Sequence, residues 1–377
     1  MKETNKASVK EFNTIIVGAG SAGLGTAIVL DQMGIEYIIL EKDGIGSSFK
    51  KWPEESCLIS PSFTGNFFNM PDLNSISPET SPAFNLATEH PTGKEYAQYL
   101  EIVAEAYKLK IQTQIKVNHV TRNKGLFCLD TTEGVYKSKY VIWAAGEYQY
   151  PNKEAFEGAD LCTHFSEVSS FSELEGDHRI IIGGYESGFD AAINLIHANK
   201  KAVIFDSLNY LELFNSDSSY SLSPYTRDRI NEVYYDLTYH KDTKAEKVEY
   251  QDGLYIVTTS NLDRFTSPYK PINCTGFDTS IALVQDLFEH NDGYPVLNDS
   301  DESTITNNLF LVGPQVKHGN ALFCFIYKYR QRFAIVAQEI AEREKVSKET
   351  ITQVLELYKQ QNFYLKDLSC CDNECAC

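Results

Sequence analysis

The chain has 377 residues, 42% hydrophobic and 23% charged, and its 52 acidic and 34 basic side chains give a net charge of −18. At roughly 150 residues per domain, this length predicts two or three folded units. The negative charge repels nucleic acid and anionic membrane surfaces, so neither is expected as a partner. No run of sequence approaches the about 18 apolar residues of a membrane span, and the polar N-terminal segment does not resemble a signal peptide, so a cytoplasmic location is expected.

The first predicted element is a strand over Thr14–Val17, followed by the glycine-rich turn Gly18–Gly23 and a helical pattern that runs to Met33. A second apolar strand, Tyr37–Leu40, ends in Glu41. The order strand, glycine turn, helix, strand predicts the opening of a parallel α/β sheet. In this context the Gly-x-Gly-x-x-Gly spacing indicates a dinucleotide site.

The three glycines of this turn have separate roles. Gly18 permits the tight turn, Gly20 lets the backbone approach a pyrophosphate, and Gly23 lets the helix pack close to the sheet. The helix N-terminus attracts the phosphates, and Glu41 is placed to accept hydrogen bonds from a ribose hydroxyl. The predicted cofactor-binding residues of this first site are Gly18, Gly20, Ser21, Gly23, Glu41 and Lys42.

Further along the chain, helical spacing over 94–107 and strand-like runs at 111–117 and 126–130 precede a strand over 139–143, which closes into Ala144-Ala145-Gly146. The opening pattern then recurs about 165 residues after its first appearance. This second copy consists of five parts: a strand (Arg179–Ile182), the turn Gly183–Gly188, a helix through Ala198, a strand (Ala202–Phe205) and Asp206.

The second turn differs from the first because Tyr185 stands where the middle glycine is expected. It is interpreted as a nicotinamide dinucleotide site, with a degenerate remnant of the fold as the alternative. A carboxylate at Asp206 suits a ribose 2′-hydroxyl and repels a 2′-phosphate, which favours NADH, although basic residues elsewhere leave NADPH open. The predicted residues of this site are Gly183, Gly184, Ser187, Gly188 and Asp206. Two dinucleotide sites in one chain indicate hydride transfer from a nicotinamide to FAD.

The last third contains strands near 255–259, 271–276 and 309–312, followed by helices over 323–343 and 348–361. Five elements of the whole chain, in their order, resemble the FAD and NAD(P) oxidoreductases with paired dinucleotide folds. These elements are Gly18–Gly23, Ala144–Gly146, Gly183–Gly188, Cys274–Phe277 and Leu309–Gly313.

The resemblance implies an α/β protein with two nested Rossmann-like dinucleotide-binding domains, in which the NAD(P) domain is inserted into a discontinuous FAD domain. It implies FAD and NADH or NADPH as cofactors, and it adds Ala145, Gly146, Gly276 and Gly313 to the cofactor-binding residues. The expected parts are 1–155 (FAD domain, first part), 156–270 (NAD(P) domain), 271–345 (FAD domain, second part) and 346–377 (a helix and a cysteine-rich tail). A homo-oligomer is expected.

Two branches of these oxidoreductases compete. The segment Ile181–Ala192 is similar to the second motif of bacillithiol disulfide reductases, which share their compact size with low-molecular-weight thioredoxin reductases. The segments Gly46–Trp52 and Ala145–Pro151 are similar to small bacterial flavin-containing monooxygenases. The chain lacks the catalytic cysteines of the reductases, because Cys162 has no Cys-x-x-Cys partner and the first glycine turn contains no cysteine. Pro314 also replaces the acidic residue that usually follows the last FAD strand.

Four of the nine cysteines, Cys370, Cys371, Cys375 and Cys377, fall within the last eight residues. Thiolates at this spacing suit either electron relay by disulfide exchange or capture of a soft metal or metalloid, so they are assigned both as catalytic and as candidate metal ligands. A dispensable tail is the remaining alternative. The other five cysteines (Cys57, Cys128, Cys162, Cys274 and Cys324) are expected to be buried, reduced thiols.

His318 follows the last FAD strand and is expected to face the flavin as an acid or hydrogen-bond donor, with a structural loop residue as the alternative. The leading hypothesis is an FAD-dependent NAD(P)H oxidoreductase that reduces a small-molecule or small-protein disulfide, or a soft metal, through the C-terminal cysteines. A flavin-containing monooxygenase acting on a small soft nucleophile is the first alternative. A sensor that binds flavin or metal without turnover is the second.

Overall fold

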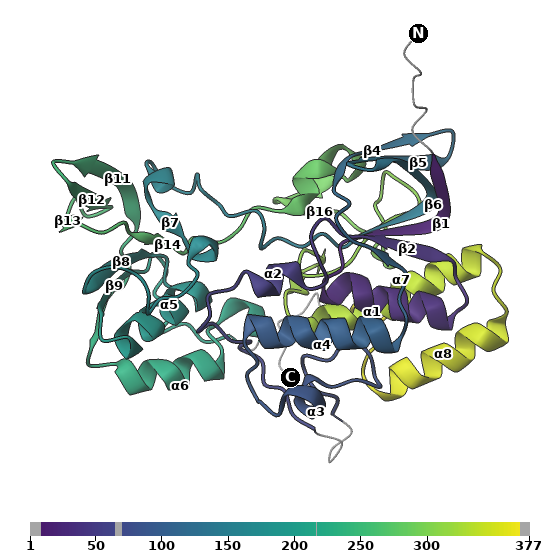
Figure 1. Cartoon of the computed structure of the whole chain (residues 1–377), viewed down its shortest axis with the longest axis horizontal. Helices are drawn as coiled ribbons and strands as arrows, with labels where there is room; N and C mark the ends of the chain where they lie inside the picture. Colours follow the sequence, from purple (N-terminus) through teal and green to yellow (C-terminus); the bar gives the residue numbers. More distant parts are fainter. Residues whose placement is uncertain (1–8, 65–69, 216, 370–377) are drawn as a thin grey trace, which may run out of the picture.

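The computed structural model describes residues 9–64, 70–215 and 217–369. Two largely parallel sheets, each flanked by helices, lie side by side along the long axis of the molecule (Figure 1). The prediction of an α/β protein with two Rossmann-like units is therefore confirmed.

The first sheet is built on the strand order β3-β2-β1-β6-β17, in which all neighbours are parallel. The strands are β3 (Ile111–Gln112), β2 (Tyr37–Leu40), β1 (Lys10–Val17), β6 (Gly134–Trp143) and β17 (Leu309–Leu311). All residues of β2 and β17 and the last four residues of β1 and β6 are buried, and all but Thr14 are hydrophobic, as expected for a parallel sheet covered by helices. The first half of β6 also pairs antiparallel with β5 (Leu126–Thr131), which pairs with β4 (Val117–Asn123).

The helices of this unit are α1 (Ser21–Gln32), α2 (Ser47–Lys50), α3 (Pro82–Leu86), α4 (Gly93–Ala106), α7 (Ile326–Arg343) and α8 (Lys348–Gln360). Helix α1 packs directly on α7, and a Cβ at Gly25 would lie 2.1 Å from the ring of Phe333. Helix α4 begins in a capping box formed by Thr92 and Glu95. The segment after α8 folds back on α7, where Phe363 is fully buried.

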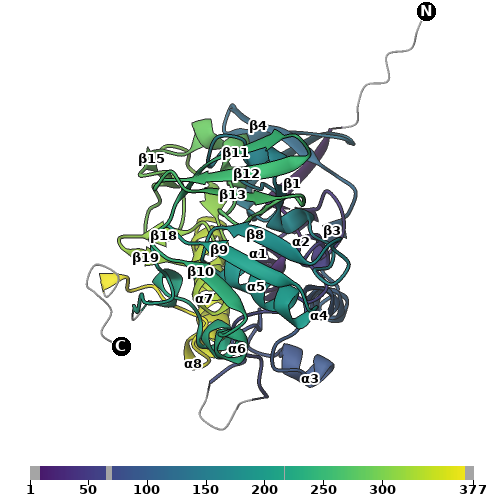
Figure 2. The ribbon, with the colours of Figure 1, turned by 90° about the vertical axis from the view of Figure 1, so that its left-hand side faces the viewer.

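The second sheet is entirely parallel, in the order β10-β9-β8-β14-β7. Figure 2 shows its strands β10, β9 and β8 next to one another. Its strands are β10 (Leu237–His240), β9 (Lys201–Phe205), β8 (His178–Ile182), β14 (Ile272–Asn273) and β7 (Thr163–His164). Helices α5 (Glu186–His197) and α6 (Pro224–Val233) and a meander of β11 (Ala245–Gln251), β12 (Leu254–Thr259) and β13 (Arg264–Ser267) complete the unit. Strand β14 lies beyond the boundary expected at residue 270, so the second sheet extends further than the sequence indicated.

Short hairpins join the remaining segments of the first unit: β15 (His290–Asn291) with β16 (Tyr294–Pro295), and β18 (Lys317–His318) with β19 (Ala321–Leu322). No helix in the described ranges is long and apolar enough to cross a membrane.

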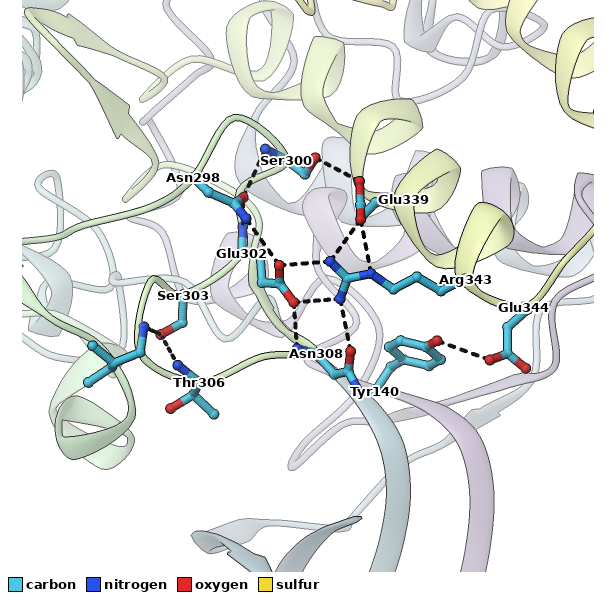
Figure 3. A network of polar contacts seen from close by, with 11 residues as sticks. Tyr140, Asn298, Ser300, Glu302, Ser303, Thr306, Asn308, Glu339, Arg343 and Glu344 are labelled. Atoms are coloured by element: carbon cyan, nitrogen blue, oxygen red, sulfur yellow. Dashed lines mark hydrogen bonds and ion pairs between the residues drawn. The ribbon is translucent and has the colours of Figure 1, made fainter. Parts of the chain in front are cut away.

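A polar network fixes the C-terminal end of α7 to the loop that precedes β17 (Figure 3). The Arg343 guanidinium donates to both carboxylate oxygens of Glu302, at 2.5 and 2.9 Å, and to Glu339 and Asn308. Asn298 adds a further donor to Glu302. Because the Glu302 side chain is only 5% exposed, these donors replace the water that its charge would otherwise need.

Candidate functional site

The carboxyl ends of β1, β2 and β6 meet the N-terminal ends of α5 and α7 around one cavity of about 460 Å³. The first glycine turn lies on one side of the cavity and the start of α5, from the second unit, on another. Ser21 at the start of α1 and Tyr329 of α7 share a hydrogen bond of 2.6 Å in its wall. Ligands of open α/β sheets bind at such carboxyl ends.

The first turn has the geometry of a dinucleotide cradle. Gly18 has φ +109°, and a Cβ there would lie 2.5 Å from the carbonyl oxygen of Ala144. A Cβ at Gly23 would lie 2.0 Å from the carbonyl oxygen of Gly18. At Gly20, in contrast, a Cβ would meet nothing within 4 Å, so this position is open towards the cavity. Gly18 and Gly23 thus stand where a side chain would clash with the backbone, and the approach of a pyrophosphate to Gly20 stays a prediction.

Glu41 at the end of β2 is buried and points back to this turn. Its Oε2 accepts a hydrogen bond from the backbone nitrogen of Ala19 at 2.8 Å, and its Oε1 accepts one from Asp43 at 2.9 Å. A carboxylate has about four acceptor positions, so capacity remains for a ribose hydroxyl. Lys42 also lines the cavity, and burial lowers the pKa of its ammonium group.

An unsatisfied acceptor supports the fit of FAD to this cavity. Ala145 and Gly146 line it as expected, and Gln149 follows them in the same segment. The Oε1 atom of Gln149 is buried and has no hydrogen-bond donor within the described residues. A flavin nucleotide carries N–H and hydroxyl donors, so the open glycine position, the helix N-terminus and this acceptor suit it.

The second turn repeats the first in its tight contacts. A Cβ at Gly183 would lie 2.4 Å from the carbonyl oxygen of Cys274, and one at Gly188 would lie 1.9 Å from that of Gly183. The middle position differs, because the ring of Tyr185 occupies the space beside the turn. Its hydroxyl donates to the carbonyl oxygens of Ser219 and Ser221, at 3.2 and 3.0 Å. Ser187, also predicted for this site, lines the shared cavity.

The structure does not present Asp206 to a ribose, contrary to expectation. Its side chain is fully buried, and its carboxylate accepts hydrogen bonds from the backbone of Leu208 and Tyr210 and from the hydroxyl of Tyr239. A Cβ at Gly184 would clash with this carboxylate, at 2.8 Å from Oδ2. Asp206 therefore holds the loop after β9 in place, and the basis for preferring NADH to NADPH is lost.

His318 is also placed differently from the prediction. Its Nε2 lies 2.5 Å from Oδ1 of Asp301, which is fully buried and also binds the Arg332 guanidinium at 2.8 Å. The imidazole packs edge-on against Phe323 and is not part of the cavity wall. His318 is thus held outside the cavity wall by Asp301, which is also paired with Arg332. This position fits the alternative that His318 is a structural loop residue.

Gly276 and Gly313 lie at strand ends but are not in the cavity wall. Gly313 has φ +108° and a Cβ there would lie 3.3 Å from Cβ of Ala22, whereas its neighbour Pro314 does line the cavity. Gly276 has φ +93°, and its carbonyl oxygen lies 2.9 Å from Nε2 of His164. Both glycines thus shape the turns that carry neighbouring cavity residues.

The four C-terminal cysteines, Cys370, Cys371, Cys375 and Cys377, lie outside the described residues. Among the described residues, no group of three or more His, Cys, Asp or Glu side chains could hold a metal ion. The five other cysteines are free thiols. Cys162 and Cys274 are buried as expected, but Cys57 and Cys128 are only half-buried and Cys324 is exposed. Cys57 and Cys324 line the cavity.

The titratable residues in the cavity wall that the sequence did not single out include Cys57, Glu147 and Cys324. For Glu147 one signal was available, because a charged residue directly follows the Ala144–Gly146 strand end. Burial raises the pKa of Glu147 to about 7, so the proton occupancy of this carboxyl changes near neutral pH. Burial also raises the pKa of both cavity thiols.

The family model described as pyridine nucleotide-disulphide oxidoreductase matches residues 15–313. The chain is 23% identical over 341 residues to bacilliredoxin reductase Bdr from Bacillus subtilis (strain 168), an alignment that covers 88% of this chain and 98% of that protein. It is 28% identical over 195 residues to the probable indole-3-pyruvate monooxygenase YUCCA1 from Arabidopsis thaliana, which is 49% of this chain and 44% of that protein. The chain thus spans nearly all of the reductase but under half of the monooxygenase.

Solved structures resemble the fold over almost its whole length. Bacillithiol disulfide reductase Bdr from Staphylococcus aureus superimposes with a TM-score of 0.71 at 20% identity, covering 89% of this chain and 99% of that one. A flavin-containing monooxygenase from Stenotrophomonas maltophilia gives 0.60 at 16% identity, covering 93% and 99%. Both branches that the sequence resembles therefore share this fold.

Proposed function

Because the chain belongs to the pyridine nucleotide-disulphide oxidoreductase family and is thus an FAD-dependent oxidoreductase, we propose that it passes electrons from NAD(P)H to the disulfide of a small molecule or small protein. The observation that carries this proposal is the single cavity reached both by the first glycine turn and by the start of α5. Two dinucleotides that enter from these sides meet inside one protein-lined space, as hydride transfer requires.

FAD supplies the two-electron chemistry when bound. The chain itself contributes the binding groups. The α1 N-terminus and Glu41 would hold the phosphates and ribose, and Gln149 would accept a hydrogen bond from the flavin nucleotide. The aromatic side chains Trp52 and Phe277 form part of the cavity wall.

Two observations favour a reductase over a monooxygenase. Two free thiols, Cys57 and Cys324, line the cavity, and the reductase relative is matched over nearly its whole length. The monooxygenase remains the second candidate, since Trp52 and the segment 147–150, from the regions that resemble monooxygenases, also line the cavity. A non-turnover sensor is the third candidate and requires that NAD(P)H never reduces the bound flavin.

The C-terminal cysteines remain a candidate electron relay or soft-metal site in this proposal. The segment before residue 369 packs on α7. The backbone nitrogen of Leu365 donates a hydrogen bond to the carbonyl oxygen of Gln331, and the carbonyl oxygen of Leu365 accepts one from the Arg332 guanidinium. Helix α7 begins in the cavity wall at Ile326. The last described residues thus pack on the helix that also borders the cavity. A homo-oligomer and a cytoplasmic location stay predictions.

Anaerobic turnover tests the proposal. The holoenzyme is given NADH or NADPH in the absence of oxygen, with a panel of small disulfides, thioredoxin-like proteins and soft metal ions. The proposal expects NAD(P)H oxidation that depends on a disulfide and yields two thiols per NAD(P)H. Oxidation that requires oxygen, with one oxygen consumed per NAD(P)H and an oxygenated substrate, would establish the monooxygenase instead.

A further inference from the structure

Cys324 lies at the junction of the two units, just before α7. Its Sγ is 3.1 Å from the Oγ of Ser219, which belongs to the second unit, and Ser219 also accepts a hydrogen bond from Lys328 at 2.7 Å. The carbonyl oxygen of Ser219 accepts from Tyr185, the residue beside the second glycine turn. The thiol is therefore exposed to the cavity at the point where the flavin-side and nicotinamide-side walls meet.

Glu147 lines the same cavity and provides an independent indication of chemistry there. Glu147 is half-buried in the cavity wall, and its carboxyl has no hydrogen-bond or ion-pair partner among the described residues. A carboxyl that lines a cavity and whose pKa is raised by burial is a candidate for binding a ligand or transferring a proton. Glu147 and Cys324 line the same cavity, and the charge of Glu147 raises the pKa of the thiol.

The charged and titratable groups around Cys324 shift the pKa of its thiol in opposite directions. Desolvation by the protein around the cavity raises the pKa of the thiol most, although the thiol itself is exposed to the cavity. The hydrogen bond to Ser219 and the charge of Lys328 lower this pKa, and Glu147 and Asp217 raise it. Lys328 is itself paired with Asp217, so little positive charge is left to stabilise a thiolate. The thiol therefore needs a nearby base to react at neutral pH.

We propose that Cys324 is the thiol that attacks a disulfide substrate in the cavity, and that Glu147 is the base that accepts its proton. This proposal rests on the proposed disulfide reductase function. The Cys324 sulfur forms a bond to one substrate sulfur, the substrate S–S bond breaks, and the leaving thiolate takes the proton from Glu147. The resulting mixed disulfide returns to two thiols when it gains the two electrons supplied by NAD(P)H and two protons, one from NAD(P)H and one from water.

Trapping of the mixed disulfide tests the assignment of Cys324. The full-length holoenzyme, oxidised and anaerobic, is mixed with dithiobis-nitrobenzoate or glutathione disulfide, and peptide mass mapping reads each cysteine separately. Cys324 is expected to acquire the adduct faster than Cys57 or Cys128. Cys324→Ser should lose this adduct and the disulfide-dependent oxidation of NAD(P)H. Cys128→Ser, on strand β5 outside the cavity wall, is the matched control and should behave like the wild type.

The role of Glu147 is read from the pH dependence of the same trapping reaction. In the wild type, the rate of adduct formation at Cys324 should rise through about pH 7, where Glu147 loses its proton. Glu147→Gln should slow the reaction at pH 7 by about a hundredfold and move the rise to the higher pH at which the thiol ionises alone. Flavin content, measured by absorbance, reports whether each variant is folded.

The possible failures are distinguishable. If Cys57 or a tail cysteine reacts first and Cys324→Ser keeps wild-type disulfide turnover, the proposal for Cys324 is overturned while the reductase function stands. If Glu147→Gln keeps the wild-type pH profile, Glu147 is not the base. If the wild type reduces no disulfide at all without oxygen, the proposed function itself fails.

Discussion

The Oε2 atom of Glu41 lies 2.8 Å from the backbone nitrogen of Ala19, which ties the end of β2 to the turn between β1 and α1. One buried carboxylate thereby positions the backbone of the first glycine turn and lines the cavity beside it.

Glu41→Ala is predicted to weaken FAD binding by tenfold to a hundredfold. The loss corresponds to about 1.5–3 kcal/mol for hydrogen bonds to a charged group. The dissociation constant, measured by flavin fluorescence on reconstitution, checks this. Glu36→Ala removes an exposed acidic residue nearby and serves as the control. Equal dissociation constants for the two variants would exclude Glu41 from the site.

Gly20→Ala and Gly23→Ala are predicted to fail in different ways. At Gly23 a methyl group would lie 2.0 Å from a backbone oxygen, so the variant should lose about 3 kcal/mol of stability or not fold. At Gly20 the space is open, so the free energy of unfolding should change by less than about 1 kcal/mol. FAD affinity should nevertheless fall by at least about tenfold, because the methyl group obstructs the pyrophosphate. Urea denaturation of the apoprotein and flavin titration measure the two effects.

The sequence predicts the geometry of the two glycine turns but not the positions of several side chains around them. Gly18, Gly23, Gly183 and Gly188 lie where the strand–turn–helix pattern put them, because their roles depend on local backbone geometry. The positions of Asp206, His318 and Cys324 depend instead on partners distant in sequence.

For each of these three residues the deciding partner lies on another segment. Tyr239 on β10 helps to bury Asp206, and Asp301 binds His318. The exposed position of Cys324 arises where its segment meets the second unit. No periodicity or motif in a single sequence encodes such pairs, so the sequence alone could not place them.

Asp206→Ala is predicted to lower the free energy of unfolding and to leave the preference between NADH and NADPH unchanged. Removal of its carboxylate leaves the backbone N–H groups of Leu208 and Tyr210 without an acceptor, and the Tyr239 hydroxyl keeps only Asn209; this should cost about 3 kcal/mol. The ratio of kcat/KM for NADH to that for NADPH should stay unchanged. Asp228→Ala, at an exposed position of α6, is the control. A changed ratio with unchanged stability would restore Asp206 to the ribose site.

Arg343→Met is predicted to destabilise the protein by about 2–4 kcal/mol at pH 7, because it leaves the Glu302 charge buried without its main partner. Burial opposes ionisation of Glu302, but the Arg343 hydrogen bonds outweigh it and hold the pKa of Glu302 below its ordinary value. The stabilisation is therefore present above the unfolded-state pKa of about 4.3 and is lost as the pH falls through the lower folded-state pKa.

Urea denaturation at several pH values checks whether this stabilisation is lost as the pH falls. The gap in unfolding free energy between wild type and Arg343→Met should narrow as the pH is lowered below about 4. A gap that is constant with pH would mean that Arg343 stabilises the end of α7 by packing on Phe310 and not through Glu302.

The most direct test of the central claim is an anaerobic stopped-flow experiment in two steps. NADH or NADPH is first mixed with the holoenzyme, and the flavin absorbance should bleach. In two separate experiments, the reduced enzyme is then mixed either with a small disulfide in the absence of oxygen or with oxygenated buffer that contains no disulfide. The account predicts that the disulfide restores the oxidised flavin spectrum without oxygen. Bleached enzyme that stays reduced with every disulfide, and recovers only with oxygen, would contradict it.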